Sequence, residues 1–386
     1  MYVTLLEWAH FLIRWIHLIA GISWIGNSFY FMWMDSSFVD DELYMVHGGH
    51  FYHVEKRKII ANFIPKTLHW FKWEATVTWL SGFVLMILLY YFTDGVYLID
   101  QASYLQNSTH AIFVSLSLIF GTWFIYDFFW HSRFAEKNYA FATILSLASL
   151  VIYTWGLCQL FTGRGAFIHL GSIFATLMVL NVWVRILPRQ TAMLNEAKAG
   201  KTPNYELGSK AKARSTHNSY MTLPVLFAML SNHFPLAYQN PHNWMVLLLL
   251  CILGAVIRHM MLEWNKGKTG MALLVPIVSL CAVLVFLTIP KQNASTQSTA
   301  SFSTVKNIID QRCLSCHSQH PSDALFPAAP NGLVFEDPLV IQKFAQKIRE
   351  RVWIAKNMPL ANRSQMTEEE RGILAKWVEA GAAIHE

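Results

Sequence analysis

Hydrophobic and polar positions alternate along this chain in whole segments rather than residue by residue. Apolar runs close to the length of about 20 residues that crosses a bilayer as a helix recur up to residue 289, with polar stretches between them. The pattern predicts an all-α, polytopic membrane domain over residues 1–289, with about eight transmembrane helices. The expected spans are residues 8–33, 73–93, 109–129, 139–161, 166–187, 218–234, 243–262 and 270–289.

We expect the first apolar segment to remain in the protein as an uncleaved span. Its hydrophobic stretch is too long for a signal peptide, no Lys or Arg precedes it, and no small-residue cleavage site follows it.

The composition supports a membrane protein. Hydrophobic residues make up 54% of the 386 residues and charged residues only 14%, whereas soluble domains carry about 25% charged residues. The formal net charge of +6 comes from the first 302 residues, because acidic and basic residues balance in the remainder. The excess basic residues lie in loops between apolar segments, so we expect membrane lipid as a partner and no nucleic acid.

The distribution of Lys and Arg predicts the orientation. Loops after the first, third, fifth and seventh spans are basic, whereas those after the second, fourth and sixth hold only Arg164. Basic loops stay in the cytoplasm. The sequence therefore predicts that the N-terminus and the C-terminal region lie outside the cytoplasm, and the c-type haem motif described next makes this the periplasmic side of a bacterial inner membrane.

The C-terminal region contains a haem attachment motif. Cys313, Cys316 and His317 form C-x-x-C-H, in which two thiols bind the porphyrin and the histidine binds the iron of a c-type haem. Met358, in a loop stiffened by Pro359, is our predicted second iron ligand. A redox dithiol and half of a zinc site are the simpler alternatives for C-x-x-C, but no second C-x-x-C is present.

The residues around this motif predict a small cytochrome c domain over 303–386, joined to the membrane domain by a polar linker at 290–302. Such a short domain needs a stabilising group, and haem c would supply it. We expect helices at 304–312 and 337–356, and a last helix opened by a capping box that begins at Thr367. Cys158, Cys251 and Cys281 lie in apolar segments, where small buried hydrophobes are expected.

Ionisable residues inside the spans are the next candidates, because such groups are costly in a bilayer and usually mark function. His10, Arg14 and His17 follow each other at spacings of four and three, which places them on one face of a helix. This face suits a haem b whose iron is bound by His17, with Arg14 beside a propionate. A hydrogen-bonded polar seam without iron is the alternative.

The predicted orientation sorts the other histidines into two groups. We expect a haem b at the outer group, with His169 opposite His17 and with His110 or His233 as alternative ligands. A second haem at the inner group would complete an electron path across the bilayer. The outer group is His10, His17, His110, His169, His233 and His242, and the inner group is His69, His131, His217 and His259.

Further polar residues are candidates for substrate or metal binding, with capping or snorkelling as the alternative. The loop 34–72 carries three histidines at a spacing of three, and the segment 185–217 reads as a solvated connector with room for a short helix. The candidates are His47, His50 and His53 in that loop, Asp127 with His131 and Arg133, Asn181 with Arg185, Asn232 with His233, and Arg258 with His259.

Several stretches resemble the bacterial membrane-bound urate oxidases, or urate hydroxylases, which carry eight spans and a C-terminal cytochrome c. These stretches are Trp15–Tyr30, Trp70–Ala75, Thr78–Phe83 and Leu223–Pro235, and they occur in the family's order. The segment around His17 also looks like that of the haem-binding membrane protoporphyrinogen oxidase, a local likeness that supports His17 as a haem ligand.

The resemblance implies an oxidoreductase that converts urate to 5-hydroxyisourate and passes electrons to haem c. A soluble cytochrome c or a terminal oxidase would then take the electrons into the respiratory chain. Because a planar anion with many acceptors needs Arg and Asn or His groups, we select Arg14, Asn232 and His233 as catalytic candidates. Another membrane oxidoreductase, acting on quinol or porphyrinogen, and a non-catalytic electron-transfer subunit remain as alternatives.

Overall fold

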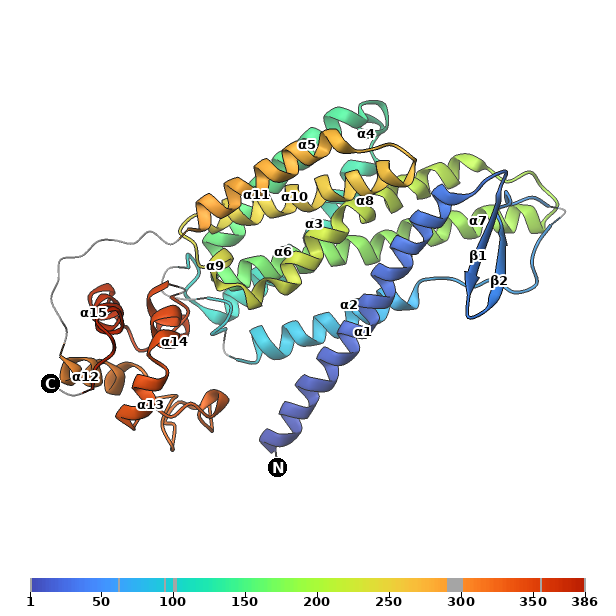
Figure 1. Ribbon diagram of the computed structural model, residues 1–386. Coiled ribbons are helices and arrows are strands. Elements are labelled where there is room, and N and C mark those ends of the chain that lie inside the picture. The colour runs from blue at the N-terminus through green and yellow to red at the C-terminus, as the bar shows by residue number, and fades with distance from the viewer. Residues whose placement is uncertain are drawn as a thin grey trace.

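The computed structural model describes residues 2–61, 63–93, 95–99, 103–289, 301–354 and 356–384. Up to residue 289 the described chain is a bundle of long helices, and from residue 301 it forms a separate small helical unit, the tail (Figure 1). Most of the predicted linker, residues 290–300, lies outside the described residues.

The eight predicted spans are all helical. They correspond to α1 (Tyr2–Ser37), α2 (Trp73–Met86) with η1 (Ile87–Tyr91), α3 (Ser108–His131), α5 (Tyr139–Leu160), α6 (Gly163–Leu180) with η2 (Asn181–Ile186), α8 (Tyr205–Leu230) with η3 (Ser231–His233), α10 (Asn243–Asn265), and η4 (Met271–Leu273) with α11 (Leu274–Thr288). Short helices α4 (Arg133–Lys137), α7 (Leu187–Lys198) and α9 (Pro235–Tyr238) lie between them.

Seven of these helices, among the described residues, are long and apolar enough to cross a membrane. The eighth, α8, is not, because its first half carries Lys210, Lys212 and Arg214. This helix packs between α6 and α10. Of its charges, Arg214 is buried against neighbouring helices, as expected for an ionisable group within a bundle, whereas Lys212 is exposed.

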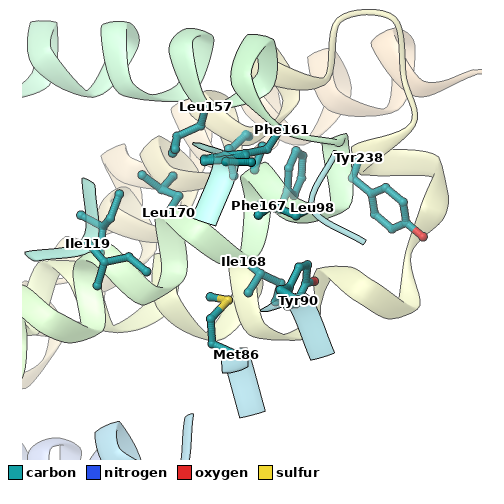
Figure 2. Close-up of a cluster of buried hydrophobic side chains, with 14 of the residues drawn as sticks. Met86, Tyr90, Leu98, Ile119, Leu157, Phe161, Phe167, Ile168, Leu170 and Tyr238 are labelled. Atoms are coloured by element: carbon teal, nitrogen blue, oxygen red, sulfur yellow. The ribbon is translucent and has the colours of Figure 1, made fainter. Parts of the chain in front are cut away.

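The bundle is arranged around α6. Of the apolar window in the helix Gly163–Lys198, 61% is buried, against none of the window in α1. Figure 2 shows the core that α6 forms with its neighbours, including Phe167 and Leu170 of α6 and Leu157 and Phe161 at the end of α5. Small residues allow the close helix contacts on which such bundles rely, as where Gly171 of α6 meets Ala228 of α8.

Two predictions for the loops were wrong. The loop 34–72 contains a β-hairpin, β1 (Glu42–His47) and β2 (His50–Glu55), in which His47 pairs with His50. Gly48 and Gly49 close it with positive φ angles of 58° and 78°, as a two-residue hairpin turn requires. The expected connector 185–217 is instead helical except for residues 199–204, because α6 continues through η2 into α7.

The bundle has two distinct ends. α3, α6 and α10 begin at the end where α11 finishes, and we call this the linker end because the chain leaves the bundle there. Asn240 Nδ2 donates to the carbonyl of Leu287 at 2.8 Å, which ties the α9–α10 loop to the last turn of α11. The opposite end carries the β-hairpin and is called the hairpin end (Figure 1).

The tail follows its predicted helices closely. α12 (Phe302–Arg312) precedes the C-x-x-C-H motif, and α15 (Glu368–Glu379) begins with the predicted capping box at Thr367. The stretch 337–356 is broken into α13 (Pro338–Lys343), α14 (Ala345–Arg349) and η6 (Glu350–Ile354), and short turns η5 (Pro330–Gly332) and η7 (Leu360–Asn362) complete the unit. Its core includes Val305, Ile309, Ile341, Leu374 and Trp377.

The contact between α8 and α10 gives a first testable prediction. A Cβ atom at Gly254 would lie 2.9 Å from Pro224 Cδ and 3.1 Å from its backbone nitrogen. We therefore expect Gly254→Ala to force α10 away from α8 and to lower the free energy of unfolding by about 1–3 kcal/mol.

Thermal unfolding of the purified protein in detergent measures this effect. The control is Gly121→Ala in α3, where a Cβ meets no atom within 4 Å and alanine favours the helix. Equal melting temperatures for the two variants would show that the α8–α10 contact is not tightly packed.

Candidate functional site

The C-x-x-C-H motif lies directly after α12. Cys313 caps the helix, and its carbonyl accepts hydrogen bonds from the backbone nitrogens of Cys316 at 3.2 Å and His317 at 2.9 Å. The His317 Nδ1 atom bonds the carbonyl of Leu333 at 2.9 Å. This contact makes Nδ1 the protonated nitrogen and leaves Nε2 as the one with a free lone pair, which is how iron-binding histidines are commonly oriented.

The thiols of Cys313 and Cys316 are both partly buried. Burial raises the pKa of the Cys313 thiol to about 12, and burial also raises the pKa of Cys316. A reactive dithiol needs a lowered thiol pKa. A zinc site needs further ligands, and within the described residues no three His, Cys, Asp or Glu side chains converge on one point. These features favour neither alternative, and haem attachment at this motif stays a prediction.

A buried arginine holds the loop that carries Met358. Arg371, which is 4% exposed, donates from Nη1 to the carbonyls of Val352 at 2.8 Å and Met358 at 2.6 Å, and from Nη2 to Asn362 Oδ1 at 3.2 Å. Met358 also packs against the same core as Cys313. The predicted donors Cys313, Cys316, His317 and Met358 thus belong to one folded unit, and they fit a covalently attached haem.

The polar face predicted for α1 is divided in the structure. His17 lies against α2, where its Nδ1 atom is 2.9 Å from the Thr78 carbonyl and 3.1 Å from Ser81 Oγ. Its ring fills the space above Gly82, since a Cβ there would lie 2.7 Å from the His17 Cε1 atom. Arg14 is exposed on the same helix. A haem ligand role for His17 stays a prediction.

His169 occupies a closed position in the bundle core. Its side chain is fully buried, Nδ1 lies 2.7 Å from the Gly165 carbonyl, and Nε2 lies 2.5 Å from Ser115 Oγ. The ring also stacks on Phe161 at 4.6 Å. Both nitrogens therefore have protein partners, and this packing does not fit an iron ligand unless the contact with Ser115 is broken.

The remaining histidines do not form a common centre. His110, His233 and His242 are exposed near the linker end. In the hairpin, His53 stacks on Tyr44 at 4.4 Å and lies 3.5 Å from Glu42, while His47 and His50 are on the other face of the two strands. The three loop histidines are therefore divided between the two faces of the hairpin.

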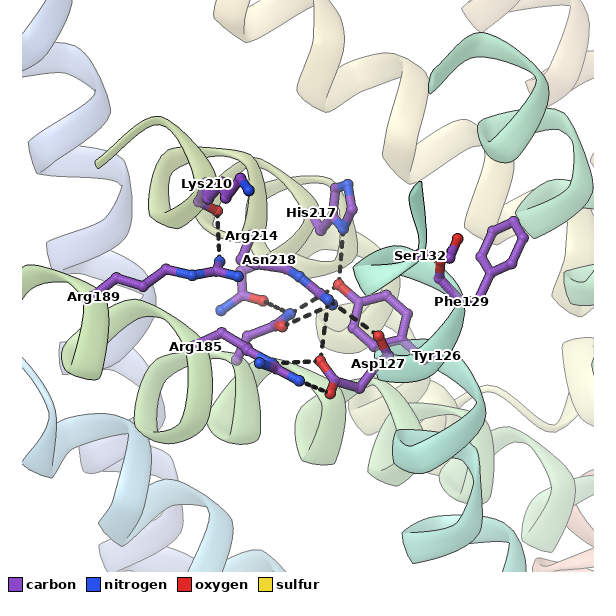
Figure 3. Close-up of polar contacts among 11 residues, drawn as sticks. Tyr126, Asp127, Phe129, Ser132, Arg185, Arg189, Lys210, Arg214, His217 and Asn218 are labelled. Carbon is purple, nitrogen blue, oxygen red and sulfur yellow. Dashed lines mark hydrogen bonds and ion pairs between the residues drawn. The ribbon is translucent and has the colours of Figure 1, made fainter. Parts of the chain in front are cut away.

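The largest polar cluster lies near the hairpin end and joins α3, η2 and α8 (Figure 3). Asp127 Oδ1 accepts hydrogen bonds from Arg185 Nε at 2.8 Å and from Arg214 Nη2 at 3.0 Å, and Arg185 also contacts Oδ2. Sequence analysis had placed Asp127 with His131 and Arg133. Its partners are instead two arginines that are distant in the sequence.

An uncharged network continues this cluster. The Asn181 amide donates to the Tyr126 hydroxyl at 3.0 Å and to Asn218 Oδ1 at 2.8 Å. The Tyr126 hydroxyl lies 2.8 Å from His217 Nδ1, and the Arg214 guanidinium stacks 4.9 Å from the Tyr126 ring. Arg214 and Tyr126 are additions to the residues selected from the sequence. The sequence shows that both residues are polar, but it does not show which residues they contact.

A shallow concavity of about 560 Å³ opens beside this cluster, lined by Phe124, Asp127, Phe128, His131, Ser132 and Arg185. Phe124 and Phe128 are 71% and 82% exposed, so the concavity opens at the side of the bundle. Arg185 already forms an ion pair with Asp127 there. We call Asp127, Arg185 and Arg214 the clamp, because their ion pairs hold three helical elements together.

The three catalytic candidates do not share a direct contact among the described residues. Arg14 and His233 are exposed, whereas Asn232 accepts a hydrogen bond from Arg164 Nε at 3.0 Å. Arg164 entered the sequence analysis only as the lone basic residue of its loop. A polar pair at the linker end is therefore formed by Asn232 with Arg164 rather than with His233.

The clamp around Asp127 gives a second prediction. Asp127→Asn removes the single carboxylate that lies between Arg185 and Arg214, so two mostly buried guanidinium groups lose their counter-charge. We expect a loss of about 3–5 kcal/mol in the free energy of unfolding, measured as a lower melting temperature in detergent.

The matched control is Asp35→Asn, because Asp35 and its partner Lys56 are each about half exposed and such pairs contribute at most about 1 kcal/mol. A similar small effect for both substitutions would contradict the clamp.

One comparison with known proteins gives a match, and this match covers the residues of the bundle. The family model described as urate oxidase N-terminal matches residues 3–289, which are the whole bundle and none of the tail. Neither the curated proteins nor the solved structures gave a match. Since the matched region covers most of the chain, the protein belongs to the urate oxidase N-terminal family.

Proposed function

We propose that this protein oxidises urate to 5-hydroxyisourate and delivers the electrons to a haem c in its own tail. The observation that carries the proposal is the joining of two parts in one chain. A bundle of the urate oxidase N-terminal family is followed by a folded unit that contains Cys313, Cys316 and His317 with the spacing of a haem attachment site.

The reaction balances without oxygen as a reactant. Urate and one water give 5-hydroxyisourate, two protons and two electrons, with a new bond between the water oxygen and carbon 5 of the purine. A haem held by Cys313, Cys316, His317 and Met358 would accept one electron at a time and pass it to a soluble cytochrome c or a terminal oxidase. The bundle therefore needs to bind the purine, admit water and take up protons.

The residues of the tail have separate roles in this proposal. The hydrogen bond between His317 Nδ1 and Leu333 fixes the imidazole orientation, and Arg371 holds the backbone of Met358 in place. Arg312 donates to Glu370 Oε1 at 2.9 Å and so ties the helix before the motif to the last helix. Through Glu370 and Arg371, helix α15 is thus bound both to the helix that precedes Cys313 and to the loop that carries Met358.

We also propose that the bundle lies in the bacterial inner membrane with the tail on the periplasmic side. The seven apolar helices and the exposed aromatic and aliphatic side chains on α1, α3 and α11 support a lipid environment. With α8 included, the bundle contains an even number of long helices, which brings its first and last residues to the same end.

The third prediction tests the proposed reaction directly. When urate is added to the purified, oxidised protein without oxygen, we expect the haem c absorption spectrum to change to the reduced form and 5-hydroxyisourate to appear, with two haem equivalents reduced per urate. Quinol and a porphyrinogen serve as comparison substrates. Haem reduction by either of these, with urate inactive, would assign the bundle to a different oxidoreductase.

The fourth prediction concerns the loop that carries Met358. Arg371→Met keeps most of the side-chain volume but leaves the Met358 and Val352 carbonyls without their donor. We expect the haem to remain covalently attached while the methionine–iron charge-transfer band weakens or disappears.

Arg349→Met is the control, since Arg349 forms a partly exposed pair with Glu379 and should leave the band unchanged. Retention of the full band in Arg371→Met would remove Arg371 from this role.

A further inference from the structure

We propose that Arg164, Asn232 and Tyr90 form the site that binds the urate anion, at the linker end of the bundle. The inference rests on the proposed function and assigns the substrate to particular residues. Three elements meet there, namely the start of α6 with Arg164, the turn η3 with Asn232 and the π-helical segment η1 with Tyr90.

Arg164 supplies a positive charge at the linker end of the bundle. It is half-buried, and within the described residues it forms no ion pair with a carboxylate. Its Nε atom donates to Asn232 Oδ1 at 3.0 Å, and its guanidinium carbon lies 4.6 Å from the centre of the Tyr97 ring. The guanidinium is thus held in one orientation, and its terminal nitrogens form no ion pair with the described residues and can donate to an anion.

Asn232 adds a second donor in a defined direction. Because the Arg164 Nε–H is a donor, the Asn232 atom that faces it must be the amide oxygen. The amide nitrogen of Asn232 therefore points elsewhere as a hydrogen-bond donor. Together the two side chains present N–H groups to an acceptor-rich planar edge, and urate has such edges in its carbonyl oxygens and deprotonated ring nitrogen.

Tyr90 provides an independent sign of a missing ligand. Its side chain is 1% exposed, yet its hydroxyl forms no hydrogen bond in the structure. The side chains of Arg164 and Asn232 lie near enough to interact with this hydroxyl, so the three polar groups face the same place, although none completes a hydrogen bond with it among the described residues. A buried polar atom without a partner is costly, and a bound molecule with acceptor atoms between Tyr90 and Arg164 would remove that cost.

Aromatic rings surround the same place. The Tyr90 ring lies edge-on to Tyr97 at 6.4 Å and to His169 at 6.0 Å. Figure 2 shows Tyr90 at the edge of the buried core, beside Ile168 of α6. Flat aromatic walls and a few directed donors are typical of sites that bind a planar heterocycle.

The other arginines of the bundle interior are less suitable. Arg185 and Arg214 share the carboxylate of Asp127. Arg258 is 1% exposed and is enclosed by the Phe29 ring, Ser219 and Met32. Arg164 differs from Arg185 and Arg214 because it has no carboxylate partner among the described residues, and from Arg258 because it is partly accessible.

The location also suits electron transfer to the tail. The chain leaves the bundle after α11, and Asn240 binds the Leu287 carbonyl close to that exit. The backbone carbonyl of Tyr238, in the same connection as Asn240, packs directly against Gly163 beside Arg164. A substrate at Arg164 would therefore lie at the end of the bundle from which the tail extends.

The test uses the purified full-length holoprotein and measures both urate binding and turnover. We expect Arg164→Met to raise KM for urate at least about tenfold, the loss associated with one charge-assisted hydrogen bond, and to weaken binding of radiolabelled urate in anaerobic equilibrium dialysis. Arg164→Lys should restore part of the affinity. Arg57→Met, at an exposed arginine that follows the β-hairpin, is the matched control.

A pair of neighbouring tyrosines separates a binding role from a structural one. Tyr90→Phe removes a hydroxyl without a partner, so it should raise KM while leaving the melting temperature equal or higher. Tyr91→Phe removes a hydroxyl that lies 2.6 Å from Ser115 Oγ, so it should lower the melting temperature and leave KM unchanged.

The outcomes distinguish this site from the proposed function. Wild-type affinity and KM in both Arg164→Met and Tyr90→Phe would overturn the site while leaving urate oxidation in place. Arg164-dependent urate binding without haem reduction would support the site and reject the proposed reaction. A wild-type holoprotein that binds no urate would overturn the site and the function together.

Discussion

The bundle depends on one carboxylate that is shared between two arginines. Asp127 of α3 binds Arg185 of η2 and Arg214 of α8, and so it connects the central helix α6–η2–α7 to helices on either side. Without Asp127, the buried Arg214 of α8 would lose its carboxylate partner. The ion pairs thereby allow a helix too polar to count as an apolar span to occupy the middle of the bundle.

The two ends of the bundle use their polar residues differently. Near the hairpin end, the charges of the Asp127 cluster are mutually satisfied, and the neighbouring amides and hydroxyls form a continuous network. At the linker end, Arg164 has no carboxylate among the described residues and the Tyr90 hydroxyl has no partner. The arrangement near the hairpin end stabilises the fold. At the linker end, Arg164 and the Tyr90 hydroxyl can still form hydrogen bonds to a ligand.

Both places coincide with π-helical turns. Tyr90 belongs to η1, and Asn181 and Arg185 belong to η2. A π-turn rotates the side chains that follow it relative to a regular α-helix, and such turns are frequent at functional sites. Each π-segment turns its polar side chains away from the face that a regular helix would give them. Regular helical periodicity in the sequence therefore does not predict where these side chains point.

The sequence by itself determined the features that depend on local chemistry. The eight helical segments follow from the lengths of the apolar runs, the tail's last helix follows from the capping box at Thr367, and the haem motif follows from the spacing of Cys313, Cys316 and His317. The two glycines of the loop 34–72 indicate a turn, but the pairing of Glu42–His47 with His50–Glu55 around Gly48 and Gly49 is seen only in the structure. Tertiary structure alone decided the partners of the polar residues, since Asp127 is 58 and 87 positions from its two arginines and Asn232 is 68 positions from Arg164. Contacts over such distances are selected by how whole helices pack, and no local pattern encodes them.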